Sequence, residues 1–434
     1  MKSQTNLHLN WTNNKQIKTN VIKPKNLYSL KKAIDKKRYI AAGNHRSYGD
    51  MAISKHNIIS MKKFNKILKF DKKKGVIEVQ SGTLLIDILK KIINKGWFFP
   101  VTPGTKYVTV GGMIANNIHG KNTRKNQIKH YIQEFEIILE NKKIVKCSRN
   151  KNKKIFDLTV GGFGLTGIIL SAKIKLRKIN SSYIYQKIEK FRNYDQLFLH
   201  LKKMRKYSYY VSWINSFDVY SIKGLSYFGD HYEKSKKKEI SFNDKKLSII
   251  YYLFLKIFSQ NYYGTKILNF FYMFIKGNFY KRETNLNNFF YPQDNFTDWN
   301  KIYGKKGFIE IQFLIDKNNF KNLMEEISNF LKNNKIFSPL IVIKNLNEKG
   351  SYLNFCGNGI SISMDIPIDK KFNLIEKFFN SLFIKYKCTL NLAKDSIVES
   401  NFFKKNKNYI KFKKDLNLLK RKKISSIFST RLEM

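Results

Sequence analysis

One stretch of the chain has the residue types of a loop wrapped around a large ligand. Residues 103–122 contain Gly104, Gly111 and Gly112 and end in the polar group His119-Gly120-Lys121-Asn122. Glycine removes the Cβ where a backbone must bend or lie against a flat group. The pattern therefore predicts backbone that contacts a ligand, and the alternative is a glycine-rich turn pair between two strands.

A second stretch has the chemistry of a phosphate-binding turn. The apolar residues 37–42 predict a short strand, which runs into Gly-Asn-His-Arg-Ser-Tyr-Gly-Asp at residues 43–50. A turn of this composition presents free backbone N–H groups, which bind anionic oxygens. Residues 43–50 are therefore a second candidate for ligand binding.

A third stretch carries Gly162, Gly164 and Gly167, which satisfy the G-x-G-x-x-G spacing of dinucleotide-binding folds. That site requires a helix directly after the glycines. Residues 168–176 instead alternate apolar and polar side chains and predict a strand. The spacing therefore indicates a ligand-facing turn and excludes a Rossmann site.

Lys394 is a further candidate, because it stands beside Asp395 directly after the alternating residues 389–392. A cation held at the end of a strand can stabilise negative charge on a ligand. The alternative for this lysine is a solvated position on the surface.

The elements that must position these residues mix strands and helices. Strands are predicted at 58–61, 67–70 and 75–80, a helix at 84–94, and a hairpin from strands 134–139 and 143–147. From about residue 179 aromatic residues become more frequent, with strands predicted at 208–214, 307–315 and 359–366 and helices at 318–333 and 370–385. The strict alternation of 359–366 implies one wet face. The pattern predicts an α+β protein.

Two strongly apolar runs, residues 247–258 and 267–275, are interrupted by lysines. We favour two core helices, because short apolar helices are more often core than anchor. The alternative is a surface that meets lipid, where aromatic and leucine side chains flanked by lysine are common.

Length and composition limit the classes of protein. With 434 residues and 42% hydrophobic residues, the chain can bury a large core and divide into two domains. The net charge of +52 is spread along the whole chain without a recognition helix or zinc-finger spacing. We therefore expect no nucleic acid partner, whereas anionic lipid headgroups or a phosphorylated substrate fit the charge.

Cysteine usage and the N-terminus indicate the compartment. Cys147, Cys356 and Cys388 lie far apart without CxxC spacing, so neither a metal site nor a disulfide framework is expected. The first residues lack the apolar core of a signal peptide, and no apolar run reaches the roughly 20 residues that span a bilayer. We expect a cytoplasmic protein, with peripheral contact at the inner membrane as the alternative.

Taken together, these motifs resemble one family. The resemblance runs through Gly43-x-x-Arg-Ser-Tyr-Gly-Asp50, residues 103–122, Val160-Gly-Gly-x-Gly-Leu-Thr-Gly-Ile-Ile169, Phe290-Tyr-Pro292 with Trp299-Asn300, Asp365-x-Pro367, Ala393-Lys-Asp-Ser396 and Arg431-Leu-Glu433. In order and spacing they are similar to the FAD-dependent decaprenylphosphoryl-β-D-ribose 2'-oxidases of the vanillyl-alcohol-oxidase, or PCMH-type, flavoprotein superfamily. The resemblance covers nearly the whole chain and is weakest in residues 220–290.

The resemblance implies a fold and a set of site residues. The implied fold is a two-domain α+β fold: a PCMH-type FAD-binding domain of residues 1–178, an antiparallel-sheet substrate domain of residues 179–388, and a return to the FAD domain in residues 389–434. By motif position the catalytic residues are Lys394, His119 and Tyr48, and the substrate contacts are Lys121, Trp213, Gln312, Ser363 and Lys394. The implied cofactor-binding residues are Ala41, Gly43, Asn44, His45, Arg46, Ser47, Tyr48, Gly49, Asp50, Gly104, Thr109, Val110, Gly111, Gly112, Asn116, Asn117, Ile118, His119, Ile169 and Asn391.

The chain departs from the family pattern at four positions. Ser363 stands where many members carry Cys, Asn391 replaces a Tyr beside the flavin, and Glu310 replaces a Gln. Arg46 stands where related flavoproteins carry the His that tethers FAD, and His45 is one residue out of register. We therefore expect non-covalent FAD and no reaction with inhibitors that need a thiol at position 363.

The implied function is oxidation of the 2-hydroxyl of a polyprenyl-phosphoryl-β-D-ribose to the 2-keto sugar. This is the first half of an epimerisation to the arabinose form in cell-wall biosynthesis, completed by a short-chain dehydrogenase/reductase partner. The first alternative is a sugar-lactone or sugar-alcohol oxidase of the same superfamily. The second, from another class, is a basic protein that binds a lipid surface or nucleic acid.

Overall fold

The computed structural model describes residues 4–35, 38–217, 222–232, 242, 249–278, 280–295 and 299–434. Its first sheet has the order β1-β2-β4-β3, with β2–β4 and β3–β4 parallel and β1–β2 antiparallel. The strands are β1 (Gln4–Leu9), β2 (Gln16–Ile22), β3 (Tyr39–Ala42) and β4 (Asn57–Ser60). The predicted loop 43–50 leaves this sheet at the end of β3.

The second sheet is antiparallel, with the order β5-β6-β10-β8-β9. Its strands are β5 (Ile67–Asp71), β6 (Val76–Gln80), β8 (Ile132–Ile138), β9 (Ile144–Ser148) and β10 (Ile168–Lys175), and a small pair joins β7 (Trp97–Phe98) to β11 (Arg177–Lys178). Strand β10 directly follows Gly167, which confirms that the glycine spacing there is not a Rossmann motif. The β8–β9 hairpin is also confirmed.

Four helices pack around these two sheets: α1 (Leu27–Ile34), α2 (Leu85–Ile92), α3 (Val110–Ala115) and α4 (Lys153–Thr159). Helix α2 buries Leu85, Ile88, Leu89 and Ile92, the apolar positions that predicted it. The short helix α3 begins at Thr109, whose hydroxyl accepts a hydrogen bond from the backbone N–H of Gly112 at 3.3 Å. The central glycine stretch is therefore a turn that opens a one-turn helix.

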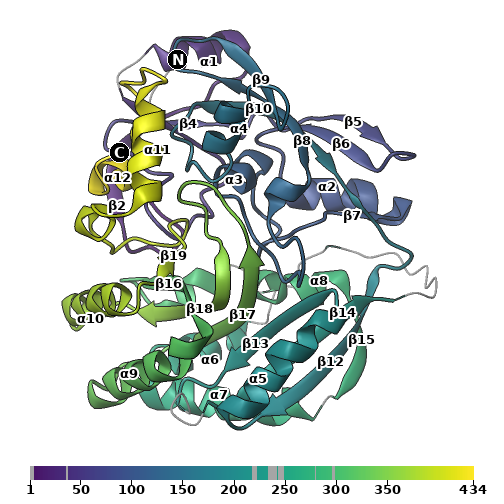
Figure 1. Ribbon diagram of the computed structural model, residues 1–434, viewed down its shortest axis with the longest axis vertical. Helices are drawn as coiled ribbons and strands as arrows, with labels where there is room; N and C mark the ends of the chain where they lie inside the picture. Colours follow the sequence, from purple (N-terminus) through teal and green to yellow (C-terminus); the bar gives the residue numbers. More distant parts are fainter. Residues whose placement is uncertain are drawn as a thin grey trace.

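The third sheet is antiparallel, with the order β15-β12-β14-β13-β17-β18-β16-β19. Its strands are β12 (Tyr183–Phe191), β13 (Tyr209–Ile214), β14 (Gly224–His231), β15 (Lys281–Asn285), β16 (Phe308–Ile315), β17 (Leu340–Glu348), β18 (Gly357–Pro367) and β19 (Thr389–Leu390). In Figure 1 this sheet forms the lower half of the molecule. The α+β class and the antiparallel sheet are confirmed.

Helices cover both faces of the third sheet. They are α5 (Tyr194–Lys203), α6 (Ile249–Ser259), α7 (Tyr262–Gly277), α8 (Leu286–Phe290), α9 (Phe320–Asn333) and α10 (Phe372–Lys385). Helices α5, α9 and α10 bury Leu197, Phe320 and Phe379 in the same core as Ile341 and Ile362 of the sheet. On the other face Met273 of α7 packs with Ile188, Trp213 and Leu225.

The alternation of residues 359–366 has a different meaning from the one predicted. Residues 359–366 are buried throughout, so no face of β18 meets bulk water. The apolar positions Ile360, Ile362 and Met364 enter the core under α9 and α10. Ser361, Ser363 and Asp365 line a cavity on the opposite side of the sheet. The polar face is covered by the rest of the molecule, which local alternation does not reveal.

The C-terminal segment returns to the first sheet. After β19 it forms α11 (Lys407–Asn417) and α12 (Ile427–Arg431), which lie beside the N-terminal strands in Figure 1. Tyr39 of β3 exchanges backbone hydrogen bonds with Lys423 and Ser425, both at 2.8 Å. The two ends of the chain therefore build one part of the molecule.

The prediction that residues 247–258 and 267–275 are core helices is wrong. Residues 247 and 248 lie outside the described part, and the remainder forms α6 and α7. Ile257, Phe270 and Phe274 are 64%, 65% and 61% exposed, so the hairpin of these two helices presents apolar side chains at the surface. Neither these helices nor any other described helix is long and apolar enough to cross a membrane.

Candidate active site

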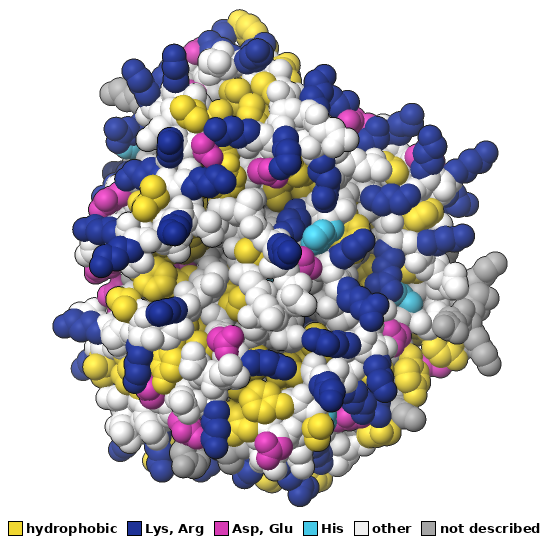
Figure 2. Space-filling view, viewed as in Figure 1, with side chains coloured by type: hydrophobic (Ala, Val, Ile, Leu, Met, Phe, Trp, Pro, Cys, Tyr) yellow, Lys and Arg dark blue, Asp and Glu magenta, His cyan; other side chains and the backbone are white. Residues whose placement is uncertain are grey.

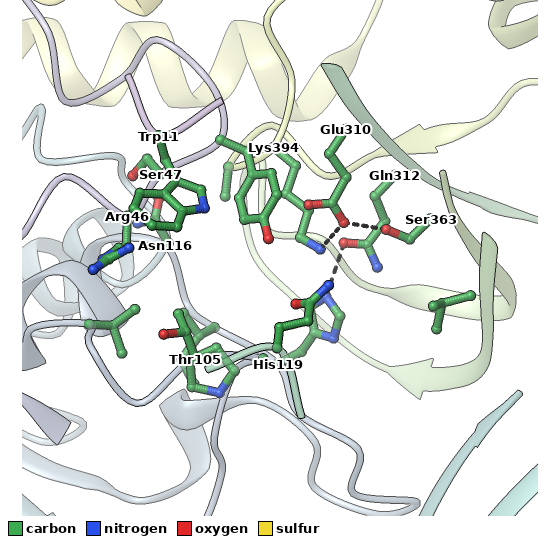
Figure 3. Close-up of a pocket in the computed structure, with 18 of the residues that line it drawn as sticks. Trp11, Arg46, Ser47, Thr105, Asn116, His119, Glu310, Gln312, Ser363 and Lys394 are labelled. Atoms are coloured by element: carbon green, nitrogen blue, oxygen red, sulfur yellow. Dashed lines mark hydrogen bonds and ion pairs between the residues drawn. The ribbon is translucent and has the colours of Figure 1, made fainter. Parts of the chain in front are cut away.

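A cavity of about 1350 Å³ lies between the glycine-rich loops and the polar face of the third sheet. The loops at 41–48, 103–121 and 163–169 form one wall, and strands β13, β16, β17 and β18 form another. Residues of α6 and α7 close a third side. Figure 3 shows Arg46 and Trp11 at one side of this cavity and Lys394, Glu310, Gln312 and Ser363 at the other.

Most of the residues predicted for the site line this cavity. Of the cofactor set, those that line it are Ala41, Gly43, Asn44, His45, Arg46, Ser47, Tyr48, Gly104, Thr109, Gly111, Gly112, Asn116, Asn117, Ile118, His119, Ile169 and Asn391. All five of the substrate set, Lys121, Trp213, Gln312, Ser363 and Lys394, line it as well. The structure therefore brings together residues that lie far apart in the sequence, from Ala41 to Lys394.

Three predicted cofactor residues do not line the cavity. Val110 is fully buried in the core of the second sheet. Gly49 lies against the C-terminal segment, because a Cβ there would meet the carbonyl oxygen of Asp395 at 2.2 Å. The carboxylate of Asp50 is fully buried and bonded to Arg431. These residues support the loop from behind and present no side chain to the cavity.

Glycines at the loop wall allow close contact between neighbouring segments. A Cβ on Gly43 would lie 2.0 Å from Oγ1 of Thr109, and one on Gly111 would lie 2.9 Å from Cβ of Ser81. The end of β3 therefore lies directly against the start of α3. A larger residue at position 43 would push the two ligand-facing stretches apart, and one at position 111 would push α3 away from Ser81.

Arg431 clamps the C-terminal segment to the loop at 43–50. Its Nε and Nη2 donate to the two carboxylate oxygens of Asp50 at 3.0 and 2.9 Å, and its Nη1 donates to Asp395 at 2.9 Å. Despite burial, these two carboxylates hold the pKa of Arg431 above its ordinary value. Because Asp395 follows Lys394, the clamp places Lys394 at the cavity.

Lys394 and Glu310 form an ion pair at the sheet side of the cavity. The Lys394 ammonium contacts Oε1 of Glu310, and the hydroxyl of Ser363 donates to the same oxygen (Figure 3). The side chain of Glu310 is 7% exposed, and its other oxygen, Oε2, has no hydrogen-bond partner among the described residues. A buried carboxylate oxygen in this state can accept a hydrogen bond from a ligand hydroxyl.

Gln312 links three elements of the site. Its Oε1 accepts from Nδ2 of Asn391 at 2.7 Å and lies 3.3 Å from Nε2 of His119. Because this oxygen is an acceptor, His119 must donate through Nε2. Burial, with Lys344 and Lys394 nearby, lowers the pKa of His119 well below its ordinary value. The imidazole is therefore neutral at pH 7 and fixed in one tautomer.

Two further lysines face the cavity near His119. Nζ of Lys121 donates to the carbonyl oxygens of Phe289 and Phe290, and Nζ of Lys344 lies 3.4 Å from the carbonyl oxygen of Gly120. Burial lowers the pKa of Lys121 to about 7, and burial together with Lys394 and Lys121 lowers the pKa of Lys344 to about 7. An anionic ligand would stabilise the protonated forms of both.

Tyr48 packs beside this cluster. Its ring lies 5.4 Å from the Lys394 ammonium and contacts Phe308 edge-on at 5.9 Å. Burial and the nearby Glu310 carboxylate raise the pKa of Tyr48 well above its ordinary value. The phenol therefore stays protonated at neutral pH, and the catalytic role that the resemblance implies for Tyr48 stays a prediction.

The sequence left Lys344, Trp11 and the contact between Glu310 and Lys394 unassigned. Lys344 lies on β17 directly after the apolar residues Ile341-Val-Ile343. A single lysine in an apolar strand was the one feature of the sequence that could have marked Lys344 as a site residue. Nothing in the sequence pattern marked Trp11 as a site residue, because its place in the site depends on the Arg46 guanidinium, which stacks 3.6 Å above its ring. Glu310 and Lys394 are 84 residues apart, so only the fold reveals their contact.

The comparisons with known proteins agree with this geometry. The sequence model of a family described as "FAD binding domain" matches residues 21–148, which include the loops at 43–50 and 103–122. The chain is 26% identical over 385 residues to "Decaprenylphosphoryl-beta-D-ribose oxidase" of Mycolicibacterium smegmatis, covering 84% of this chain and 82% of that relative. It is 25% identical over 157 residues to "L-gulonolactone oxidase" of Bos taurus, covering 36% of each.

The chain is therefore an FAD-dependent oxidoreductase with a PCMH-type FAD-binding domain. Within that class its sequence resembles the decaprenylphosphoryl-β-D-ribose oxidases along most of its length. A "Putative D-arabinono-1,4-lactone oxidase" of Neurospora crassa is 22% identical over 159 residues, 36% of this chain and 29% of that relative. The likeness to lactone oxidases thus covers a smaller part of the chain.

The residues on the cavity wall also fit FAD by their own chemistry, apart from any sequence similarity. Oγ of Ser81 and Oδ1 of Asn116 are buried atoms on that wall without a hydrogen-bond partner among the described residues. Both lie beside the glycine-rich backbone of residues 103–122, which offers N–H groups and flat surface to a ligand. Buried polar atoms without a hydrogen-bond partner are expected at a site where a bound ligand supplies the missing partner.

Proposed function

We propose that this enzyme oxidises the 2-hydroxyl of a polyprenyl-phosphoryl-β-D-ribose to the 2-keto sugar. The observation that carries the proposal is a single cavity that combines three chemistries. It has a glycine-lined wall suited to FAD, a cationic cluster of Lys121, Lys344 and Lys394, and an apolar side formed by α6 and α7. A sugar joined through a phosphate to an isoprenoid needs a hydroxyl-binding, an anion-binding and an apolar region.

In this proposal residues 1–178 and 389–434 form the FAD-binding domain, and residues 179–388 form the substrate domain. The backbone of residues 41–48 would hold the diphosphate of FAD, and residues 104–119 would hold its ring system. Bound FAD would supply the hydride acceptor for the carbon that carries the hydroxyl. With Arg46 stacked on Trp11 at the position of the tethering His, the cofactor is held non-covalently.

The side chains of this enzyme handle the hydroxyl and its proton. Lys394 donates a hydrogen bond to the sugar oxygen. In this chain, which has Glu310 where the family pattern has Gln, Oε2 of Glu310 accepts the hydroxyl proton as the carbon gives up its hydride. Ser363 and Lys394 stabilise the carboxylate through its other oxygen, Oε1. Neutral His119 donates through Nε2 to Gln312, whose Nε2 donates to Ser361 at 3.0 Å, and these bonds fix the orientation of the Gln312 amide at the cavity wall.

The cationic cluster binds the phosphodiester. Lys344 reaches the carbonyl oxygen of Gly120, Lys121 follows Gly120 in the chain, and both lysines line the cavity. Trp213 of β13 lies against Tyr272 of α7 with ring centroids 4.9 Å apart. The sugar and the first isoprene units would lie between these groups. Since a ketone at C2 is only half of an epimerisation, a short-chain dehydrogenase/reductase that reduces it to the arabinose form is the expected partner.

The test uses the purified protein reconstituted with FAD. Anaerobic addition of a polyprenyl-phosphoryl-ribose should bleach the flavin absorbance, and free aldonolactones at the same concentration should not. If the lactone bleaches the flavin and the lipid-linked sugar does not, the enzyme is a lactone oxidase and the proposed substrate is wrong. Acid precipitation should release the flavin into the supernatant, and flavin retained in the pellet would contradict non-covalent binding.

A further inference from the structure

We propose that the outer face of the α6–α7 hairpin docks the enzyme onto a bilayer with anionic headgroups, beside the mouth of the substrate cavity. The claim that this cavity takes a lipid-linked substrate rests on the proposed function. The docking surface itself rests on the helices alone. We define it as Leu253, Ile257, Tyr263, Ile267, Phe270 and Phe274, which are 43% to 74% exposed.

Helix α7 has the opposite polarity to a helix that packs on a soluble protein. Its buried positions include Thr265 and Asn269, which are 1% and 5% exposed, and Nδ2 of Asn269 donates to Oδ1 of Asn215 at 3.0 Å. Apart from Lys266, its exposed side chains are largely aromatic and aliphatic, with positions 263, 267, 270 and 274 on one side of the helix. Such a surface is unfavourable in water and stable where apolar side chains enter a bilayer interface.

The docking surface adjoins the cavity. Phe271, Tyr272 and Ile275 line the cavity and are also 51%, 37% and 52% exposed. The hydroxyl of Tyr272 bonds to that of Tyr227 at 2.7 Å, which ties this edge of α7 to the third sheet. The cavity therefore opens beside the exposed apolar residues. An isoprenoid tail can remain in the bilayer while its phosphate and sugar enter.

The charge on the hairpin favours an anionic bilayer over a second copy of this chain. Residues 249–277 contain Lys256, Lys266 and Lys276 and no Asp or Glu. Two copies pressed together through this face would bring like charges close without a carboxylate from either hairpin. Phosphate headgroups would instead neutralise all three lysines, and each lysine near an anionic surface strengthens binding by about fivefold.

Vesicle co-sedimentation of the full-length, FAD-loaded enzyme tests the proposal. The wild type should bind vesicles of phosphatidylglycerol and phosphatidylcholine and bind pure phosphatidylcholine more weakly, with binding falling as salt rises. The double variant Phe270→Glu/Phe274→Glu should lose at least about tenfold in vesicle affinity, because both rings leave the interface. Neither residue lines the cavity, so the variant should keep its flavin spectrum.

The matched control is Leu199→Glu/Leu418→Glu, at two apolar residues, one on α5 and one directly after α11, that are 64% and 61% exposed. This variant should bind vesicles as the wild type does. Equal losses in both variants, or no vesicle binding by the wild type, would overturn the proposal. The proposal would also be overturned if the wild type were a dimer, and if Phe270→Glu/Phe274→Glu made it a monomer without changing its vesicle binding. Vesicle binding needs no substrate, so its failure is distinct from failure of the proposed reaction.

Discussion

The replacement of Glu310 by Gln tests the chemistry of the site most directly. Glu310 is buried on β16, and its Oε1 accepts from both Lys394 and Ser363. Gln keeps the shape and leaves a carbonyl oxygen for these donors, but it cannot take up a proton at neutral pH. The change therefore removes the proposed base with little change in packing.

The expected loss follows from the two roles of the carboxylate. A positioned base contributes about 10²- to 10⁴-fold to a proton transfer, which corresponds to about 3–5 kcal/mol of barrier. The ion pair with Lys394 becomes a hydrogen bond from the ammonium to a neutral carbonyl oxygen, which costs about 1–2 kcal/mol of folding free energy. We expect kcat to fall at least about 100-fold while KM changes by less than about tenfold.

The assay follows the reductive half-reaction anaerobically by flavin absorbance over a range of pH. Urea denaturation and the flavin spectrum show separately whether the Glu310→Gln protein folds and keeps its cofactor. The matched control is Ser363→Ala, which removes the second donor to the same carboxylate oxygen and leaves the charge in place. Its rate should stay within about tenfold of the wild type, since one neutral hydrogen bond contributes about 0.5–1.5 kcal/mol.

A near-native kcat in Glu310→Gln, together with a native flavin spectrum, would refute the proposed role of Glu310 as the base. In that case the proton is taken up elsewhere, and Glu310 serves only to hold Lys394. A loss confined to KM would also refute the role as a base, because it would show that the carboxylate acts in binding.

Three further predictions concern the cations of the site. Lys394→Ala should keep the fold and flavin but lower kcat by at least about 100-fold, and near-native turnover would remove this lysine from the mechanism. Lys121 and Lys344, with pKa values lowered to about 7, are cations below that pH and lose charge above it. KM for the phosphodiester substrate should therefore rise between pH 6 and 9 and rise less steeply in Lys344→Met, and a flat wild-type profile would exclude an anion-binding role. Arg431→Met leaves two buried carboxylates without their cation, so urea unfolding should show a loss of about 3–5 kcal/mol with weaker flavin retention. A loss below about 1 kcal/mol would show that the clamp is dispensable.

Much of the local structure could be predicted from the sequence because it depends on neighbouring residues. Gly167 followed by the alternating residues 168–176 was enough to exclude a Rossmann motif, and β10 begins there. The glycine stretches at 43–50 and 103–122 identified the wall of the cavity, since backbone without Cβ has few other uses. These features need no knowledge of what packs against them.

Tertiary structure decided which side chains meet and which faces are covered. Alternation in residues 359–366 predicted a polar face, but only the fold turned that face toward a cavity. Arg431 and Asp50 are 381 residues apart, and no local pattern pairs them. The apolar runs in α6 and α7 favoured a core, yet Ile257 of α6 and Phe270 and Phe274 of α7 are exposed. Hydrophobicity is a property of each residue, whereas burial depends on whether another part of the chain lies against it, and here none of the described chain covers this face.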